Sequence, residues 1–448
     1  MFSKSHLTCA LLFCFVTRTI AQFDMSSNQN LAVYWGQNSY GAVNPSDTAN
    51  WQQPISYYCN DTVINTLPIA FLDEFYSTGN LPSINLANTC TSPVFSGTDL
   101  LNCSFLASDI EYCQAAGKIV TMSLGGATGS PGFTNDTEAA AYAQIIWDLF
   151  LGGSSTTRPF GSAVLDGIDM DIEGGSQTGL VSFLSALRTL MDGGSKPYYI
   201  TAAPQCPYPD AYIGTTLNEF GFDAVYVQFY NNYCGLTNYD NTNAWDFDTW
   251  DNWAQTVSPN PDVKVYIGAP ASSSAAGSGY VSPSTFTPII QETMAEYSSF
   301  GGVMLWDASQ AYANDRYDIS VKDALLGGTS APPPTTTITT TTTTVPTTKT
   351  TIVSTTSTTS TSTTSSASPT TTSGTGSCAG VAAWQTGVAY VGGDEVTYGC
   401  VYKLTCAHGL ALNVSRYNSG DLWTANWWSE NDVPGGASGD WANDGACV

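Results

Sequence analysis

Three carboxylates alternate with apolar side chains in one short stretch of the chain, at Asp169, Asp171 and Glu173. Successive side chains of a β-strand point to opposite faces, so the three carboxylates are predicted to share one face. Their Cα atoms are then about 6–7 Å apart, because a strand rises about 3.3 Å per residue. Carboxylates this close titrate together, and at least one pKa is expected to rise. A raised pKa is how a carboxylic acid stays protonated near neutral pH.

Two other interpretations fit the stretch less well. A solvated acidic strand edge would not alternate so regularly with Ile168, Met170 and Ile172. The start of an EF-hand calcium loop is a closer alternative, but that loop needs a bidentate Glu at its twelfth position, which is Leu180 here. The pattern therefore favours catalysis. Asp166 has the opposite parity, so we expect it to have a structural role at the start of the strand.

Histidine usage narrows the chemistry. The chain has two histidines, His6 and His408, and the central 300 or so residues have none. A Ser-His-Asp triad or a histidine metal site is therefore impossible in that region. Hydrolysis there would depend on carboxylates, tyrosines or a bound ion.

The charge balance argues against two classes of partner. The chain has 12 Lys and Arg residues against 37 Asp and Glu residues. Nucleic acids and anionic lipids both attract a basic surface, so we expect neither nucleic acid nor a membrane as a partner. Neutral and cationic substrates remain compatible with the acidic surface.

The central region alternates strand-like runs with longer amphipathic or polar stretches. Eight strand-then-helix units over about 300 residues predict an α/β fold, the (β/α)₈ barrel. In that fold the catalytic groups lie at the C-terminal ends of the strands. Glu173 is at such an end, directly before Gly174-Gly175. The predicted strands are Leu31–Gln37, Leu67–Phe75, Ile119–Gly126, Ala163–Glu173, Tyr198–Pro204, Ala224–Tyr230, Val263–Ala269 and Gly302–Asp307, and the predicted helices are Asp136–Leu151, Gln177–Met191 and Pro283–Ser299.

Aromatic residues fall near the ends of four different predicted strands: Tyr34, Phe71, Tyr230 and Trp306. A single aromatic residue is more often part of the core than of a binding site. Four at strand ends can converge on one mouth of the barrel. Flat aromatic walls suit the apolar C–H faces of sugar rings.

These features together resemble a known family. The run Asp166-x-x-Asp169-x-Asp171-x-Glu173 is similar to the signature of glycoside hydrolase family 18, the chitinases. The resemblance extends over about residues 30–326 and is closest to the plant and fungal class III branch. Five further motifs appear in the same order: Tyr34-Trp35-Gly36-Gln37-Asn38, Ser123-Leu124-Gly125-Gly126, Ala202-Ala203-Pro204-Gln205-Cys206, Gln228-Phe229-Tyr230-Asn231-Asn232 and Gly302-Val303-Met304-Leu305-Trp306.

The resemblance implies a role for each acid. In this family the substrate's own N-acetyl group is the nucleophile. Glu173 would be the general acid and then the base, and Asp171 would hydrogen-bond the acetamido N–H. Asp169 would share a proton with Asp171, Tyr230 would bind the acetamido oxygen, and Trp306 would form the floor of the subsite. No metal and no organic cofactor would be needed.

Further residues follow from the same resemblance. The segment Ala271–Phe300 is too short for the inserted domain of processive members, so an open cleft and endo-type cleavage are expected. The additional expected substrate contacts are Tyr34, Phe71, Gly126, Gln228, Asn231 and Met304. The implied disulfides are Cys59–Cys113, Cys90–Cys103 and Cys206–Cys234.

The N-terminal residues 1–21 have the pattern of a secretory signal. Lys4 precedes an apolar run at Leu7–Val16, and Thr19-Ile20-Ala21 is a plausible cleavage site. Six cysteines between Cys59 and Cys234 and four from Cys378 onward also suit a secreted chain with disulfides. We expect a monomer, secreted to the medium or the cell wall, with its catalytic domain at residues 22–328.

A Ser/Thr-rich segment follows at residues 329–377. Ser and Thr make up 33 of the 43 residues from Thr335 to Ser377. Such a composition predicts a disordered, O-glycosylated linker, with a reach on the order of 100 Å or more.

The last 71 residues, 378–448, regain cysteines and aromatics. They resemble the small, β-rich chitin-binding modules of carbohydrate-binding families 5 and 12, although an extra loop near Cys400–Tyr417 departs from that pattern. Five tryptophans exceed what so small a core can bury, and Trp427, Trp428 and Trp441 are the predicted stacking platform. A Trp-rich core held by two disulfides is the alternative.

The sequence therefore predicts a secreted endochitinase that binds chitin, chitooligosaccharides or another cell-wall polysaccharide. A carbohydrate-binding protein with an inactive site is one alternative, although Glu173 is present here. An endoglycosidase that acts on peptidoglycan or on the N-glycan core is a second alternative. A structural cell-wall protein is a third.

Overall fold

The computed structural model describes residues 23–129 and 132–328, together with the backbone of five short strands nearer the C-terminus. The chain divides into two units, Met1–Ser330 and Ala331–Val448. The predicted signal at residues 1–21, the predicted linker at residues 329–377, and both Trp427 and Trp428 lie outside the described residues.

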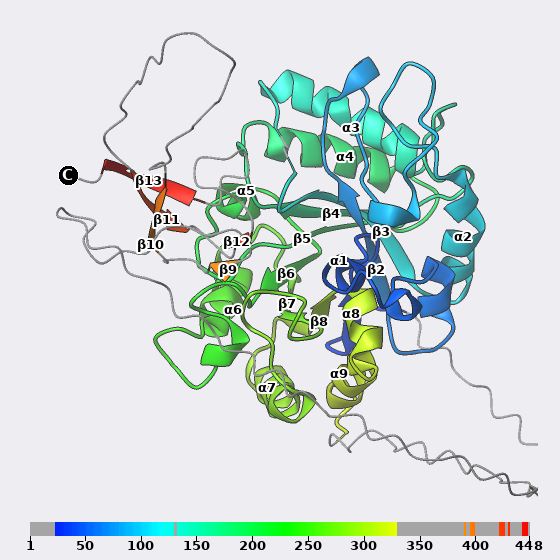
Figure 1. Cartoon of the computed structure of the whole chain (residues 1–448). Coiled ribbons are helices and arrows are strands. Elements are labelled where there is room, and N and C mark those ends of the chain that lie inside the picture. The colour runs from blue at the N-terminus through cyan, green and yellow to red at the C-terminus, as the bar shows by residue number, and fades with distance from the viewer. Residues whose placement is uncertain are drawn as a thin grey trace, which may run out of the picture. The chain divides into compact units, whose positions relative to one another are not determined.

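The first unit is built around a closed barrel of eight parallel strands (Figure 1). Each strand pairs with the next one along the chain, and the eighth pairs with the first. The predicted (β/α)₈ barrel is therefore confirmed. The strands are β1 Asn30–Val33, β2 Thr66–Leu72, β3 Ile119–Gly126, β4 Gly167–Ile172, β5 Tyr199–Ala202, β6 Ala224–Gln228, β7 Lys264–Pro270 and β8 Phe300–Trp306.

Helices surround this barrel (Figure 1). The three predicted helices are present, and capping explains where two of them begin. Asn135 accepts a hydrogen bond from the Glu138 N–H (3.0 Å) at the start of one, and Ser282 precedes Pro283 at the start of another. The helices are α1 Ser39–Val43, α2 Ala107–Ala115, α3 Asp136–Phe150, α4 Leu180–Asp192, α5 Gly214–Glu219, α6 Phe247–Thr256, α7 Pro283–Glu296, α8 Ala308–Ala313 and α9 Tyr317–Leu325, with 3₁₀ turns at Thr48–Asn50, Ile55–Cys59, Thr78–Asn80, Ala87–Thr89, Ser104–Leu106 and Leu236–Asn238.

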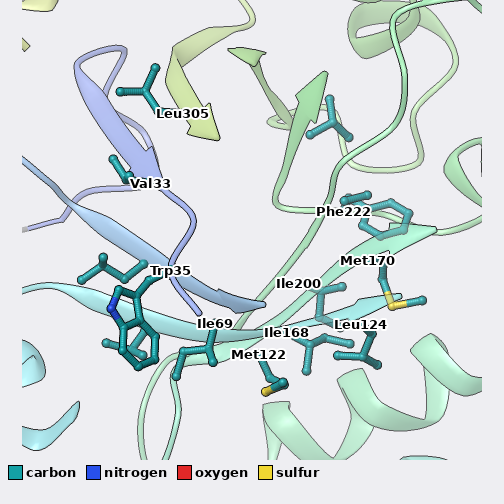
Figure 2. Packing of buried hydrophobic residues seen from close by; sticks show 14 of the residues in the cluster. Val33, Trp35, Ile69, Met122, Leu124, Ile168, Met170, Ile200, Phe222 and Leu305 are labelled. Atoms are coloured by element: carbon teal, nitrogen blue, oxygen red, sulfur yellow. The ribbon is translucent and has the colours of Figure 1, made fainter. Parts of the chain in front are cut away.

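The two faces of β4 have opposite character, as the alternation predicts. Ile168, Met170 and Ile172 are buried in the layer between the strands and the helices, and Figure 2 shows Ile168 and Met170 in this layer. Asp169 and Asp171 point to the inside of the barrel, where both are buried. The apolar half of the strand thus fixes the orientation of the acidic half.

Asp166 has the structural role that its parity predicts. It lies just before β4 and accepts hydrogen bonds from the Lys196 ammonium (2.7 Å), the Gln114 amide (2.8 Å) and the Val120 N–H (2.9 Å). These contacts join the entry of β4 to α2, β3 and the turn before β5. The loss of a buried carboxylate of this kind destabilises a fold without touching the chemistry at the other end of the strand.

Three disulfides lie in the described part of this unit, with the pairing that the family resemblance implies: Cys59–Cys113, Cys90–Cys103 and Cys206–Cys234. The third joins the end of β5 to the loop after β6. Among the described residues, no helix has both the length and the apolar character that a membrane crossing requires.

The second unit contributes five short strands. β10, β11 and β13 form an antiparallel sheet in the order β10-β11-β13, and β9 pairs with β12. Trp441 is the first residue of β13, and the structure describes its backbone only. The strands are β9 Ala389–Tyr390, β10 Glu395–Tyr398, β11 Asp421–Ala425, β12 Ser429–Glu430 and β13 Trp441–Ala446.

Candidate active site

The predicted acids and aromatics meet at the C-terminal end of the barrel. Glu173 directly follows β4, and Tyr34 directly follows β1. Trp306 and Gln228 are the last residues of β8 and β6, and Phe71 is next to last in β2. Parallel strands end at the same rim of a barrel, so five residues that are far apart in sequence share one site.

Asp169 is a fully buried carboxylate that accepts three hydroxyl hydrogen bonds. The Tyr34 hydroxyl donates to Oδ2 (2.6 Å), as does Ser123 (2.7 Å), and Thr201 donates to Oδ1 (2.7 Å). Strand register explains the last two, because Ser123 on β3 and Thr201 on β5 both lie opposite Asp169. Burial raises the pKa of Asp169, and the three donors oppose that rise by stabilising the charged form.

Asp171 and Glu173 form a coupled pair on the same face. The Asp171 carboxyl hydrogen-bonds with Glu173. The Gln228 amide lies across the pair, 3.0 Å from Asp171 Oδ1 and 3.4 Å from Glu173 Oε1, and it also donates to the Ala203 carbonyl (2.9 Å). A single amide therefore bridges two carboxyl groups whose titrations depend on each other.

Burial and the negative charge of neighbouring carboxylates raise the pKa values of this pair. Burial, Glu173 and Asp169 together raise the pKa of Asp171 well above its usual range. Burial raises the pKa of Glu173, and hydrogen bonds from Gln228 and Asp171 oppose that rise. No lysine or arginine in the described ranges forms an ion pair with these acids. The pKa values of both acids are therefore raised, which is the direction that the spacing of the acids predicts.

The resemblance implied a proton shared by Asp169 and Asp171, and that assignment stays a prediction. In the structure, Asp169 accepts hydrogen bonds from three hydroxyl groups. Together with burial, Glu173 and Asp169 both raise the pKa of Asp171.

Three aromatic rings form a wall beside the acids. The rings of Phe71 and Trp306 are stacked, with centroids 5.8 Å apart and planes 16° apart. Tyr34 lies 5.6 Å from the Trp306 ring and 6.3 Å from the Phe71 ring. Phe71 and Trp306 are half-buried, so each presents a ring face or edge to solvent. Such a wall can pack against a sugar ring.

Gly126 provides the space for one of these rings. A Cβ atom at Gly126 would lie 2.8 Å from the Phe71 ring, and its φ of +81° is one that side-chain-bearing residues rarely adopt. Gly126 is itself buried. Its part in the site is to admit the Phe71 ring rather than to contact a substrate.

Tyr230 is 8% exposed and faces the acids from the end of β6. Burial raises its pKa well above the usual range, and Asp171, Glu173 and Asp169 raise it further. The hydroxyl therefore stays protonated and can donate a hydrogen bond at any pH at which the barrel is folded. No hydroxyl or amide in the described residues accepts from it.

Two expected contact residues have other surroundings. Met304 has no exposed surface and packs with Ala32 and Tyr266 inside the barrel, so the expected sugar contact is not possible in this structure. Asn231 is exposed, but its side-chain oxygen Oδ1 accepts from the backbone N–H of Ser278 (3.0 Å). Its backbone N–H donates to the backbone carbonyl of Ser278 (3.3 Å). Asn231 therefore anchors the loop after β7 beside Tyr230.

Sequence reasoning missed Ser123, Thr201, Gln205 and Asp210. Ser123 and Thr201 donate hydrogen bonds to Asp169. Gln205 lowers the pKa of Glu173. Asp210 is a buried carboxylate whose charge acts on both Asp171 and Glu173. Isolated polar residues inside apolar strands were the available signal for Ser123 and Thr201.

The described residues contain one group that could be taken for a metal site, Cys206, Cys234 and Asp246. It does not fit a metal, because both sulfurs are in a disulfide and cannot ligate as thiolates. A separate hollow of about 320 Å³ lies between the loop after β6 and α7, where the Tyr239 hydroxyl donates to Glu292 (2.8 Å). None of the catalytic acids lines that hollow.

Comparisons with known proteins agree with this geometry. A family model described as glycosyl hydrolases family 18 matches residues 30–281, which is more than half of the chain. Chitinase 2 of Rhizopus oligosporus is 45% identical over 331 residues, 74% of this chain and 58% of that protein. Endochitinase 33 of Trichoderma harzianum is 41% identical over 328 residues, 70% of this chain and 98% of that protein. The chain thus spans about three fifths of the Rhizopus relative and nearly all of the Trichoderma one.

Solved structures with a similar fold include a chitinase and an inhibitor protein. A chitinase from Ipomoea carnea superposes with a TM-score of 0.55 at 31% identity, over 66% of this chain and 99% of that one. A xylanase and alpha-amylase inhibitor protein from Scadoxus multiflorus superposes with a TM-score of 0.54 at 30% identity, over 67% and 99%. From its family match, its fold and its acids, this chain belongs to glycosyl hydrolases family 18.

Proposed function

We propose that this protein is an endochitinase that hydrolyses β-1,4 linkages between N-acetylglucosamine residues with net retention at the anomeric carbon. The observation that carries the proposal is the pair of carboxyl groups of Asp171 and Glu173, bridged by the Gln228 amide, beside the stacked rings of Phe71 and Trp306. The site thus combines an acid that holds a proton near neutral pH with a wall that suits a sugar face.

Glu173 is the acid in this proposal. It donates a proton to the glycosidic oxygen, while the carbonyl oxygen of the substrate's own acetamido group attacks the anomeric carbon and the glycosidic bond breaks. The aglycone leaves as an alcohol. Glu173, now a carboxylate, takes a proton from a water molecule that attacks the same carbon and reopens the cyclic intermediate. Two displacements at one carbon give net retention.

Asp171 and Tyr230 orient the acetamido group. When the sugar binds, Asp171 turns from Glu173 to the acetamido N–H and leaves the shared proton on Glu173. The Tyr230 hydroxyl, which stays protonated, donates to the acetamido oxygen. Asp169 raises the pKa of Asp171. Its negative charge also stabilises the positive charge that develops on the acetamido group.

The remaining assignments extend the proposal to the whole chain. Residues 1–21 direct secretion, residues 22–328 are the catalytic domain, and residues 329–377 are a linker to a chitin-binding module at residues 378–448. Binding by that module would raise the local concentration of the barrel on insoluble chitin. The short segment between β7 and β8, Ala271–Ser299, supports endo cleavage, because it has no room for an inserted domain.

A non-enzymatic role is the second candidate, because a solved relative at 30% identity is named as an inhibitor of other hydrolases. The retained acids argue against that role here, since a binding protein has no need for two carboxyl groups whose titrations depend on each other.

Turnover of chitohexaose by the purified full chain separates the two candidates. Wild type and Glu173→Gln are incubated with chitohexaose, and with cellohexaose as the matched oligosaccharide that lacks the acetamido group. Cleavage of chitohexaose alone, lost in the variant, supports the proposal. Binding of chitohexaose without turnover by the wild type would refute it in favour of the binding protein.

A further inference from the structure

The loop after β5 contains a buried carboxyl group that the mechanism above does not use. Asp210 is 5% exposed. Its Oδ1 accepts from the backbone N–H groups of Tyr212 and Ile213 (2.7 Å each), and its Oδ2 accepts from the N–H of Gln205 (2.9 Å). No lysine or arginine in the described residues pairs with it. Burial raises the pKa of Asp210, and the three backbone donors oppose that rise by stabilising the charged form.

The backbone that Asp210 holds is joined to the catalytic pair. Gln205 forms a parallel bridge with Gln228, and the backbone hydrogen bonds on either side of it measure 2.8 and 3.2 Å. The Gln228 side chain is the amide that lies across Asp171 and Glu173. The position of that amide thus depends on the bridge, and the bridge is fixed from the other side by Asp210.

Gln205 adds a second amide to the same acid. Its side-chain Oε1 accepts from the Asn232 amide (3.2 Å), which leaves its NH₂ group to face Glu173, whose pKa it lowers. Gln205 directly precedes Cys206, and Asn232 lies two residues before Cys234, the cysteine to which Cys206 is bonded. The orientation of the Gln205 amide is therefore set by a residue in the loop after β6.

The two residues act on Glu173 with opposite sign. The charge of Asp210 raises the pKa of Glu173, because it disfavours a second carboxylate nearby. The Gln205 amide lowers it, because an N–H donor stabilises the charged form. The other titratable groups in the described residues that face the pair are Asp169 on the same strand, Tyr34 after β1 and Tyr230 after β6.

We propose that Asp210 is a positioning residue for the general acid, because it fixes the Gln205–Gln228 bridge from which the Gln228 amide contacts both Asp171 and Glu173. Its charge also helps Glu173 to keep its proton until the glycosidic oxygen is in place. This inference rests on the proposed function, since it assigns a role in proton transfer by Glu173.

The test compares Asp210→Asn with Gln205→Met in kcat/KM against pH, with chitohexaose as substrate. The alkaline limb of the profile reports the loss of the proton from the free enzyme's acid. Asp210→Asn is expected to move that limb to lower pH by ~0.5–1 unit, because the repelling charge is gone. Gln205→Met is expected to move it to higher pH by about half a unit, because a donor to the carboxylate is gone.

Asp251→Asn is the matched control. Asp251 is also a buried carboxylate that accepts a loop N–H, from Ser299 (3.1 Å), and it lies in α6, outside the site. Asp251→Asn is expected to melt at a lower temperature, with both limbs of its kcat/KM profile at the wild-type pH. If Asp210 only stabilised its loop, Asp210→Asn would also melt at a lower temperature and leave both limbs unchanged.

Opposite shifts for the two site variants support the inference. Limbs that stay within about 0.2 pH unit of an active wild type in both variants would overturn it and leave the proposed function intact. If Asp210→Asn does not fold, the upward shift of Gln205→Met decides, and its absence counts against the inference. A wild type that does not cleave chitohexaose refutes the proposed function instead.

Discussion

The hydroxyl of Tyr34 offers a direct test of how the buried charge of Asp169 is supported. Tyr34→Phe removes a 2.6 Å hydrogen bond to Oδ2 of Asp169 and keeps the ring that contacts Phe71 and Trp306. Hydrogen bonds to a charged acceptor contribute about 1.5–3 kcal/mol. Ser123 and Thr201 still donate to Asp169 in the variant, so we expect a loss of about 1.5–2 kcal/mol in the free energy of unfolding at pH 7.

The loss should depend on pH with a definite sign. Burial already raises the folded pKa of Asp169 above its unfolded value, so the folded state binds more protons than the unfolded state in the window between the two. Stability from this group is therefore present at low pH and is lost as pH rises through the folded pKa. Removal of a donor raises that folded pKa further. The difference between wild type and Tyr34→Phe should thus be small near pH 4 and larger at pH 7.

Urea denaturation followed by tryptophan fluorescence, at pH 4 and pH 7, measures this difference. Tyr142→Phe is the matched control, because the Tyr142 hydroxyl is equally buried but has no hydrogen-bond partner among the described residues. Its removal should leave stability unchanged or slightly increased. An equal loss for Tyr34→Phe at both pH values, or a loss no larger than that of Tyr142→Phe, would refute the view that Tyr34 supports a charged Asp169.

Three further changes test other parts of the site. Asp171→Asn should lower kcat for chitohexaose by about 10²–10⁴-fold with little effect on melting temperature, because it removes the proton-sharing partner of Glu173; a loss below tenfold would contradict the shared-proton arrangement. Gly126→Ala should lower the free energy of unfolding by about 1–3 kcal/mol and raise KM, because its Cβ would lie 2.8 Å from the Phe71 ring; an unchanged KM would show that the ring does not contact substrate. Trp306→Ala should raise KM by about tenfold, since it removes the ring stacked on Phe71; isothermal titration of an inactive Glu173→Gln background measures the same loss in binding, and equal affinities would exclude Trp306 from the subsite.

Much of this site could be predicted from the alternation of residue types along the strands. The alternation over β4 predicts that Asp169, Asp171 and Glu173 share a face, and burial of Ile168 and Met170 on the other face confirms it. Parity does not give depth, however. Met304 has the same parity as Trp306 and indeed points inside the barrel, but it lies one layer lower and is fully buried.

The missed residues depend on pairing and on loop conformation, which one strand's pattern does not contain. Ser123 and Thr201 reach Asp169 only because of the register of β3 and β5 with β4. Asp210 acts through backbone N–H groups that its own loop gathers around it. The short helices α5 and α8 were also not predicted, because six residues are too few to show a helical period.

The anomeric form of the first product tests the central claim most directly. Chitohexaose is added to the purified protein in an NMR tube, and the new reducing ends are observed before mutarotation mixes them. Substrate-assisted catalysis by Glu173 predicts that the β-anomer appears first and that Glu173→Gln produces neither anomer. An initial α-anomer would contradict the account, because it requires a single displacement by water at the anomeric carbon.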